Sequence, residues 1–417
     1  MKKIKGRYQN KDRRVIDREY MSYEDVPIED YRDEEPIPKN LTKKFLKVFL
    51  ILFISVVVVL ALTNINSLTP DNISHWFQYD LLGKTEGDGY PIKFNGTNVK
   101  AQNFELMESC PVYCSDTTFA VLNSNAGLYQ EAQHSFANPS MNVNAGYSLI
   151  YNINATGYKI INREKIIRSS SAKGKIFCAD ISKNGVYALL TEGKDYLSQL
   201  IVYRNDNLEK YRYNFADYYV NRVALNSDGS RAVLSGVSAK NGGLVSVIYI
   251  LDFSQENYLQ KYEVEDRIIY DVKYLNSGNV IAVGESSAYY INVNDNKKTD
   301  IPYNSRVLTN YALDREDGLL LSLSQNPDGK ECDVIMINNS GEQIASISTG
   351  KSIQSLDYRN NRIAILFTDS LCLYSMNGDV LSTVQSEIGT KKICFYSDST
   401  LYTLGKSQIS QVKMNLK

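Results

Sequence analysis

The sequence contains few of the residues from which metal sites and catalytic triads are usually built. Among its 417 residues there are only two histidines, His75 and His134, and a single tryptophan, Trp76. Because His75 precedes the folded domain predicted below, a site with several histidine ligands is disfavoured, and so is a Ser-His-Asp triad. The G-x-S-x-G elbow of many hydrolases is absent as well. We therefore assign no catalytic, cofactor-binding or metal-binding residue, and no cofactor, from the sequence.

The six cysteines are too few and too dispersed to form the disulfide scaffold of so long a chain. Only Cys110 and Cys114 are close in sequence, and their C-x-x-x-C spacing matches neither the C-x-x-C redox motif nor a zinc knuckle. We expect either a small-loop disulfide between them or two free thiols. The other four lie in apolar, strand-like runs and are expected to be free core residues. They are Cys178, Cys332, Cys372 and Cys394.

The part of the chain after the first 47 residues carries no excess of positive charge. The net charge is −1, and residues 1–47 hold 13 Lys and Arg against 10 Asp and Glu, so the remainder is slightly acidic. Nucleic-acid binding is therefore excluded as a function, because it requires a basic surface.

One long apolar run interrupts this charged sequence. Residues 48–62 carry no charge, and Ser55 is their only polar residue. With Phe45 and Leu46 the run reaches about 18 residues, enough to cross a bilayer. Four lysines precede it, whereas the first basic residue after it is Lys84. The positive-inside rule then predicts a signal anchor at residues 45–63, with a cytoplasmic N-terminus and an extracytoplasmic C-terminal domain. A cleavable signal peptide is disfavoured by the long basic leader, and a core helix by the missing polar face.

The segments on either side of the anchor are predicted to lack a core of their own. Residues 1–44 form a basic block, 1–18, followed by an acidic block, 19–35, and are expected to be a disordered cytoplasmic tail. This tail could contact anionic lipid, dock a cytoplasmic protein, or only fix the topology. Residues 64–90 are expected to contain a short helix at about 70–82, started by Thr69 and Pro70, and a linker.

From about residue 100 onward one unit recurs, in which an apolar strand, a polar turn and a second apolar strand are followed by further strands. The clearest copies are FCADISKNGVYALLTEG, residues 177–193, and VALNSDGSRAVLSG, residues 223–236. The turns are placed at Asp116, Gly146, Gly185, Gly229, Gly278, Gly318, Asn361 and Asp398. Their spacing averages about 40 residues, as expected for four-stranded propeller blades of roughly 40–45 residues.

The repeat predicts an all-β fold, a β-propeller at residues 91–417. Eight blades are favoured, and seven remain an alternative because the short first interval could hide a misassigned strand. Tandem β-sandwiches are a further alternative. The last copy has only three strands, so residues 90–95 are expected to supply its fourth strand and close the ring.

Two kinds of resemblance support this interpretation. The SKNGVYALL and SDGSRAVL frames at residues 182–190 and 227–234 resemble blade turns of WD40-like and TolB-like propellers, although the Trp-Asp dipeptide of WD40 blades is absent. The layout of charged tail, anchor, TPDN helix start and GYPI segment is similar to a poorly characterised family of membrane-anchored bacterial β-propeller proteins with a domain of unknown function. This resemblance implies membrane attachment and a propeller, and it brings no catalytic residues.

The predicted function is a membrane-anchored module that binds or scaffolds an envelope protein or a glycan at a propeller face. The alternative is an extracytoplasmic, carboxylate-dependent hydrolase or lyase that acts on cell-wall sugars. A third hypothesis, a dimerising sensor, lacks a small-x-x-x-small pattern in residues 56–62. Tyr218 and Tyr219 could belong to a contact face or could be ordinary surface-strand tyrosines. Three Asp-Gly turns superficially resemble calcium loops and are interpreted as hairpin turns, since none has the EF-hand spacing.

Overall fold

The computed structural model describes residues 47–52, 55, 87–265, 267–314 and 318–415. The chain divides into two compact units, residues Met1–Ile73 and Ser74–Lys417. In the first unit, residues 47–52 and 55 are helical. The predicted tail, most of the predicted anchor and the predicted helix at 70–82 lie outside the described residues. Within the part of the chain that is described, no helix combines the length and the apolar character needed to cross a membrane.

The strands of the second unit form eight four-stranded sheets, which we number as blades in chain order. Blades 1 to 4 consist of β2 (Val99–Met107), β3 (Cys110–Ser115), β4 (Thr118–Leu122) and β5 (Leu128–Gln133); β6 (Pro139–Asn144), β7 (Tyr147–Asn152), β8 (Gly157–Ile161) and β9 (Ile166–Ser171); β10 (Ile176–Ile181), β11 (Tyr187–Thr191), β12 (Ser198–Tyr203) and β13 (Glu209–Phe215); and β14 (Tyr219–Leu225), β15 (Arg231–Lys240), β16 (Gly243–Asp252) and β17 (Gln260–Glu265). Blades 5 to 8 consist of β18 (Ile269–Tyr274), β19 (Val280–Gly284), β20 (Ser287–Asn292) and β21 (Lys297–Pro302); β22 (Val307–Asp314), β23 (Gly318–Ser324), β24 (Cys332–Ile337) and β25 (Gln343–Ser348); β26 (Ser355–Arg359), β27 (Arg362–Leu366), β28 (Ser370–Ser375) and β29 (Val380–Gln385); and β30 (Lys392–Ser397), β31 (Thr400–Leu404), β32 (Gln408–Lys413) and β1 (Ile92–Lys93).

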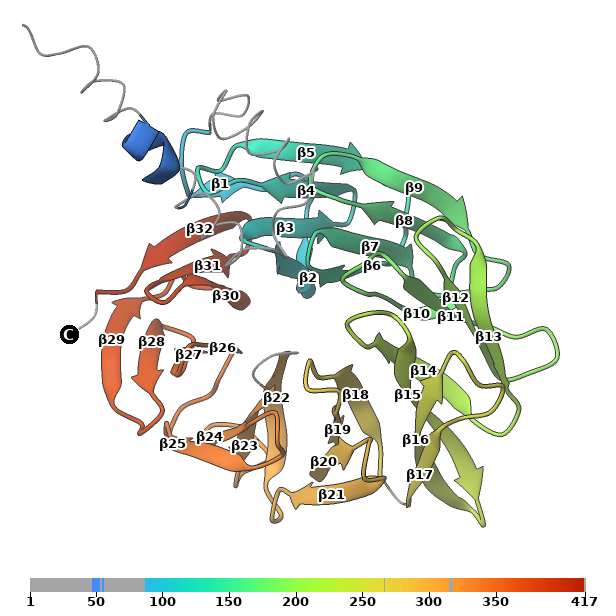
Figure 1. Cartoon of the computed structure of the whole chain (residues 1–417). Coiled ribbons are helices and arrows are strands. Elements are labelled where there is room, and N and C mark those ends of the chain that lie inside the picture. Colours follow the sequence, from blue (N-terminus) through green and yellow to red (C-terminus); the bar gives the residue numbers. More distant parts are fainter. Residues whose placement is uncertain (1–46, 53–54, 56–86, 266, 315–317, 416–417) are drawn as a thin grey trace, which may run out of the picture. The chain divides into compact units, whose positions relative to one another are not determined.

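These sheets are arranged around a common centre, with the first strand of each blade innermost (Figure 1). The prediction of an eight-bladed all-β propeller is confirmed. Strands in the middle of a blade are covered on both faces by the neighbouring blades, so β4, β11 and β19 are buried along their whole length. Outer strands such as β13 instead alternate between half-buried and exposed residues, as expected where one face meets solvent.

The ring is closed by the strand that precedes the first blade. In blade 8, β1 pairs antiparallel with β32, with Ile92 opposite Ile409 and Lys93 opposite Gln408. The prediction that residues 90–95 complete the last blade is therefore confirmed. Because this pairing joins the two ends of the repeat, it removes the free edges that would otherwise remain in the ring.

The sequence pattern assigned the wrong turn as the first turn of blade 1, one strand too late in the chain. Its first turn lies at Glu108 and Ser109, between β2 and β3, whereas Asp116 lies in the next turn, between β3 and β4. The reason is chemical, because Asp116 is a typical turn residue whereas Glu108 adopts a positive φ of 57° without being glycine, asparagine or aspartate. The short first interval was thus a misassigned turn, and the number of blades is unaffected.

Candidate interaction surfaces

The inner strands of the propeller are joined by polar side chains around the central channel. Each inner strand would otherwise present unpaired backbone groups, and buried groups of this kind must find partners. At every one of the eight seams between blades, an inner-strand side chain contacts the neighbouring blade. In chain order these contacts are Asn103 Nδ2–Pro139 O, Asn144 Nδ2–Ile181 O, Asp180 Oδ2–Leu225 N, Arg222 Nε–Tyr270 O, Tyr311 Oη–Asp271 Oδ2, Asn310 Nδ2–Gln354 O, Asp357 Oδ2–Phe395 N and Lys392 Nζ–Glu105 Oε1.

Three of these contacts use aspartates, and each aspartate belongs to a different seam. Asp357 accepts a hydrogen bond from the backbone N–H of Phe395 at 2.6 Å, and burial raises its pKa to about 7. Burial also raises the pKa of Asp271, whose carboxylate lies 3.4 Å from the hydroxyl of Tyr311. These carboxylates therefore act in joining blades. Among the described residues, no seam pairs two of the three, as glycoside hydrolysis would require.

The one histidine of the propeller contacts a cysteine, but the pair is not arranged for nucleophilic catalysis. His134 Nε2 lies 3.4 Å from Cys114 Sγ and 3.1 Å from the carbonyl oxygen of Ser115, while the backbone N–H of Phe136 donates to Nδ1. Because Nδ1 accepts, Nε2 carries the proton and cannot take one from the thiol. Burial raises the pKa of Cys114 to about 12, so the thiol stays protonated.

All six cysteines are buried, and none of them forms a disulfide. Cys110 and Cys114 lie on the same strand, β3, and four residues of extended chain separate them by about 13 Å. A disulfide between them is therefore excluded, since it requires Cα atoms within about 7 Å. The prediction of free core cysteines at the other four positions is confirmed.

The Asp-Gly segments that superficially resemble calcium loops are turns stabilised by their own side chains. Asp228, between β14 and β15, accepts hydrogen bonds from the backbone N–H of Ser230 at 2.9 Å and from its hydroxyl at 2.6 Å. Residues 326–329 likewise connect β23 to β24. In the described ranges of the chain, no group of three or more His, Cys, Asp and Glu side chains could hold a metal ion.

The propeller has two distinct ends. We call the end with the blade-to-blade connections and the hairpins between second and third strands the crossover end, and the opposite end the turn end. At the crossover end, the inner strands of blades 3 to 6 share a bulge that inserts one residue at an equivalent position. The inserted residues are Phe177, Asn221, Tyr270 and Thr309. Bulges redirect side chains, and here they occur at the rim of the channel.

A hollow of about 520 Å³ lies at the crossover end where blade 3 meets blade 4, and we call it the crossover hollow. Its lining is Asn154, Lys175, Phe177, Glu192, Gly193, Tyr196, Leu197 and Tyr219. The rings of Phe177 and Tyr219 lie 4.9 Å apart. Tyr196, Leu197 and Tyr219 are 44%, 47% and 39% exposed, which is unusual for large apolar side chains brought together in one concave site.

The local sequence explains how these side chains are presented. A Cβ atom at Gly193 would lie 2.8 Å from the carbonyl oxygen of Tyr196, so the loop between β11 and β12 requires glycine there. Tyr218 and Tyr219 point to different environments. Tyr218 is buried and donates to Glu263 at 2.7 Å, whereas Tyr219 reaches the hollow.

The sequence left open whether Tyr218 and Tyr219 belong to a contact face or are ordinary surface-strand tyrosines, and of the two only Tyr219 lines the hollow, while its other lining residues were not named. Aligning the repeats would have placed Phe177, Asn221 and Tyr270 in one column just before the first long apolar stretch of each blade. That column corresponds to the bulge, and it would have indicated that Phe177 lies at the rim of the channel. Nothing in the repeat marks Tyr196, because it lies in a loop whose sequence differs from blade to blade.

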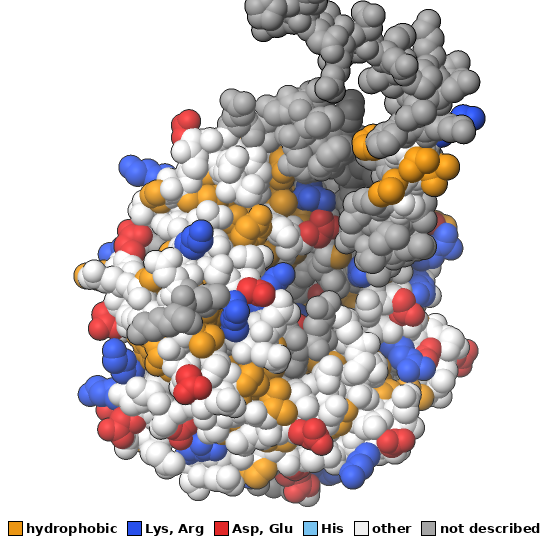
Figure 2. Space-filling model, turned by 60° about the vertical axis from the view of Figure 1, so that its left-hand side comes forward, with side chains coloured by type: hydrophobic (Ala, Val, Ile, Leu, Met, Phe, Trp, Pro, Cys, Tyr) orange, Lys and Arg blue, Asp and Glu red, His pale blue; other side chains and the backbone are white. Residues whose placement is uncertain are grey.

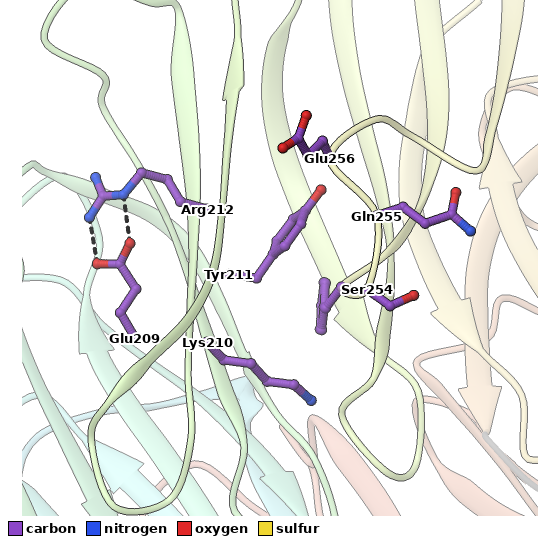
Figure 3. A pocket seen from close by; sticks show the side chains of 8 residues that line it. Glu209, Lys210, Tyr211, Arg212, Ser254, Gln255 and Glu256 are labelled. Carbon is purple, nitrogen blue, oxygen red and sulfur yellow. Dashed lines mark hydrogen bonds and ion pairs between the residues drawn. The ribbon is translucent and has the colours of Figure 1, made fainter.

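The opposite end of the same seam carries a second concavity of about 490 Å³, which we call the rim groove (Figure 3). Its lining is Glu209, Lys210, Tyr211 and Arg212 of β13 and Phe253, Ser254, Gln255 and Glu256 of the loop between β16 and β17. The rings of Tyr211 and Phe253 lie 4.9 Å apart. The guanidinium of Arg212 donates two hydrogen bonds to the carboxylate of Glu209, at 2.8 and 2.7 Å.

The visible surface carries no extended patch of a single charge. Figure 2 shows basic and acidic side chains interspersed with apolar ones over the described part of that face. This distribution agrees with the net charge of −1 and gives no field for a highly charged partner.

These features define the molecule as a closed eight-bladed β-propeller with two concave sites at one seam. Solved propellers share the fold at low identity. BamB from Moraxella catarrhalis is 12% identical with a TM-score of 0.51, covering 79% of this chain and 99% of its own. A eukaryotic initiation factor is 10% identical with a TM-score of 0.54, covering 79% and 90%. The C-terminal WD40 domain of Sif2 is 10% identical with a TM-score of 0.53, covering 79% and 98%.

The chain belongs to a family of unknown function, DUF5711, whose model matches residues 89–414. No curated protein sequence matches it. The expected resemblance to propellers with a domain of unknown function is therefore confirmed for the propeller, and the membrane anchor stays a prediction.

Proposed function

We propose that this protein is a single-pass, membrane-anchored propeller that binds another envelope protein outside the cell through the crossover hollow. The observation that carries the proposal is the exposure of Tyr196, Leu197 and Tyr219 beside the half-buried Phe177 around one concavity. Aromatic side chains gathered in a hollow are typical of the residues that contribute most of the affinity in protein interfaces. Polar side chains, among them Lys175 and Glu192 paired at 3.6 Å, complete the lining, and this mixture of apolar and polar groups favours a protein partner.

The rigidity of the site supports the same proposal. The hollow spans the seam between blades 3 and 4, where 17 buried apolar residues form one core cluster. Side chains fixed on such a scaffold lose little conformational freedom on binding, so more of the contact energy appears as affinity.

Site-specific photo-crosslinking of the full-length protein in its own cells tests the binding site. A crosslinker in place of Leu197 is expected to capture one dominant partner. A crosslinker in place of Val380, which is 49% exposed at the turn end, serves as the matched control and is expected not to capture it. With the partner purified, the double variant Tyr196→Ala, Tyr219→Ala is expected to bind at least about tenfold more weakly than wild type.

Two results would contradict the proposal. One is equal capture of the same protein from both crosslinker positions. The other is unchanged affinity in the double variant. Deleting residues 2–38 is expected to leave the captured partner unchanged, because the hollow belongs to the propeller. Loss of the partner on this deletion would instead place binding on the cytoplasmic side.

The proposed location rests on the sequence of residues 45–63 and its flanking lysines. Protease added to intact cells is expected to cleave the loop that contains Ile388, a residue that is 85% exposed, while a cytoplasmic marker stays intact. After lysis and extraction at high pH, the chain is expected to stay with the membranes. Protection of the loop in intact cells, or release into the soluble fraction, would overturn this part of the proposal.

A further inference from the structure

The rim groove differs from the crossover hollow in the chemistry that it offers. Its floor consists of two aromatic rings, Tyr211 and Phe253, and its walls are almost entirely polar. Figure 3 shows Tyr211 in the middle of the groove, between β13 and the loop that carries Gln255 and Glu256. A ligand that fits here must therefore combine an apolar face with several hydrogen-bonding groups.

The positive and negative charges of the groove balance one another. Arg212 is held by Glu209 and also donates to Gln199 Oε1 at 2.7 Å. The ammonium of Lys210 donates to the carbonyl oxygen of Gly229 at 2.7 Å and keeps its charge. Because Glu256 carries the opposite charge, the lining as a whole has no net charge.

The polar groups that remain free select the ligand further. The side chains of Gln255 and Glu256 make no hydrogen bond to the described residues. The hydroxyl of Tyr211 has no partner among them either, but it is fully enclosed, so Tyr211 offers only its ring to a ligand. The groups that remain free are therefore an amide and a carboxylate, which donate and accept hydrogen bonds with hydroxyl groups. An anionic ligand gains no net attraction, because the carboxylate of Glu256 offsets the positive charge of Lys210.

A cationic ligand is disfavoured for a different reason. The Nζ atom of Lys210 lies 5.6 Å from the centroid of the Phe253 ring, so the protein's own ammonium already occupies the position that a cation would take over that ring.

We propose that the rim groove is a binding subsite for an uncharged saccharide. A sugar ring presents C–H groups on one face, which pack against Tyr211 and Phe253, and hydroxyl groups at its edge, which pair with Gln255 and Glu256. This inference is independent of the proposed protein partner, because it concerns a different end of the seam and different residues.

Titration calorimetry on the full-length protein in detergent micelles tests the inference. The probes are cellobiose, maltose and N,N′-diacetylchitobiose, with glucosamine and glucose phosphate as the charged counterparts. At least one neutral disaccharide is expected to bind with a Kd of about 1 mM, as for a shallow site with few contacts. Neither charged probe is expected to bind as tightly.

Matched variants distinguish the side chains that line the groove from nearby side chains that do not line it. Gln255→Ala removes a free hydrogen-bonding side chain and is expected to weaken binding about fivefold, whereas Phe253→Ala removes part of the floor and weakens it more than about tenfold. Tyr213→Phe is the control, because Tyr213 lies on the same strand as Tyr211, is also partly buried and does not line the groove. It is expected to leave the affinity unchanged.

Three results would overturn the inference. The first is tighter binding of a charged probe than of any neutral one. The second is that no neutral disaccharide binds with a Kd below about 20 times the expected value of about 1 mM. The third is unchanged affinity in a folded Phe253→Ala variant. Thermal unfolding of each variant, compared with wild type, shows that the fold is retained. If only the double variant of the crossover hollow loses its protein partner while saccharide binding persists, the two sites are separate.

Discussion

The seam between blades 3 and 4 and the seam between blades 7 and 8 differ in the amount of apolar surface that they bury. The first contains a core cluster of 17 buried apolar residues, with aromatic contacts such as Phe215 to Tyr249 at 5.3 Å. The second contains a cluster of eight. In both seams an inner-strand aspartate accepts a backbone N–H of the next blade, Asp180 from Leu225 and Asp357 from Phe395, and burial raises the pKa of Asp357 to about 7.

The larger apolar cluster lies between two concave sites. The crossover hollow and the rim groove lie at the two ends of the seam between blades 3 and 4, and aromatic side chains line both of them. We therefore expect the two seams to differ in the stability that is lost with an aromatic ring and in the pH dependence that their carboxylates produce.

The largest expected effect comes from removing an aromatic ring from the apolar seam. Phe215→Ala is expected to lower the free energy of unfolding by about 4 kcal/mol, because a buried phenylalanine leaves a cavity that rigid neighbours cannot fill. Phe395→Ala in the other seam is the matched variant and is expected to cost about 3 kcal/mol, since its cluster is smaller. Urea unfolding of both variants measures the difference. A larger loss for Phe395→Ala would show that the seam between blades 7 and 8 is the more tightly packed one.

The second effect concerns the buried carboxylate. Because the pKa of Asp357 is raised from 3.8 to about 7 in the folded protein, the folded state binds this proton more tightly than the unfolded state. Stability is therefore lost as the pH rises from about 4 to 7. Asp357→Asn keeps an oxygen for the N–H of Phe395 and cannot ionise. It is expected to stabilise the protein by about 1–2 kcal/mol at pH 8 and by little at pH 4, less than the full shift implies because channel water screens the charge.

The control for this prediction is the exposed Asp369, whose pKa is lowered by the hydroxyl of Ser370. Asp369→Asn is expected to give no stabilisation at pH 8. Thermal unfolding between pH 4 and pH 8 measures both variants. Equal behaviour of the two variants would contradict the assignment of the pH dependence to Asp357.

The fold could be predicted from the sequence because each blade repeats the same local chemistry. Glycine or asparagine at the first turn, followed by a strand of small and β-branched residues, recurs in most blades, and the unpaired strand at residues 90–95 indicated the closure. The first turn was misplaced because Glu108 adopts a left-handed conformation without a residue that favours it. The first turn was misplaced in one repeat and left seven blades open as an alternative, but the periodicity of the other repeats favoured eight, the number that the structure has.

The candidate sites could not be predicted in the same way, because they depend on contacts between blades. Phe177 and Tyr219 are 42 positions apart in sequence, and their rings meet only after blades 3 and 4 have packed together. Tyr211 and Phe253 meet across the same seam. The sequence does not indicate which of the adjacent tyrosines 218 and 219 is buried. Tyr218 is the buried one because it contacts Glu263 and Lys261 of β17, which are distant in sequence.

A third prediction compares the pH dependence of the two seams directly. Hydrogen bonds from Lys261, Tyr218 and Lys240 lower the pKa of Glu263 to about 2. The ionised carboxylate therefore stabilises the folded state above about pH 4.5, and this contribution is lost as the pH falls toward 2, the reverse of the effect at Asp357. Glu263→Gln is expected to cost about 0.5–1 kcal/mol at pH 7, because its side chain is 32% exposed and the charges are screened.

Unfolding in urea at pH 7 and at pH 3 measures this variant, and the difference from wild type is expected to shrink at the lower pH. The double variant with Asp357→Asn is expected to show additive effects, since the two groups lie in different seams. A loss at pH 3 as large as at pH 7 would show that Glu263 acts by packing, not through its charge.

The smallest effect on stability is expected at Gly193, where the fold and the proposed binding site can be separated. Gly193→Ala places a methyl group 2.8 Å from the carbonyl oxygen of Tyr196, so the exposed loop must move. Because the loop contributes little to the core, the free energy of unfolding is expected to fall by only about 0.5 kcal/mol. Tyr196 and Leu197 move with the loop, and capture of the protein partner from position 197 is expected to drop severalfold, while saccharide binding at the rim groove stays unchanged. Retained capture at wild-type level would show that partner binding does not depend on the geometry of this loop. That result would contradict the proposal that the crossover hollow is the docking site.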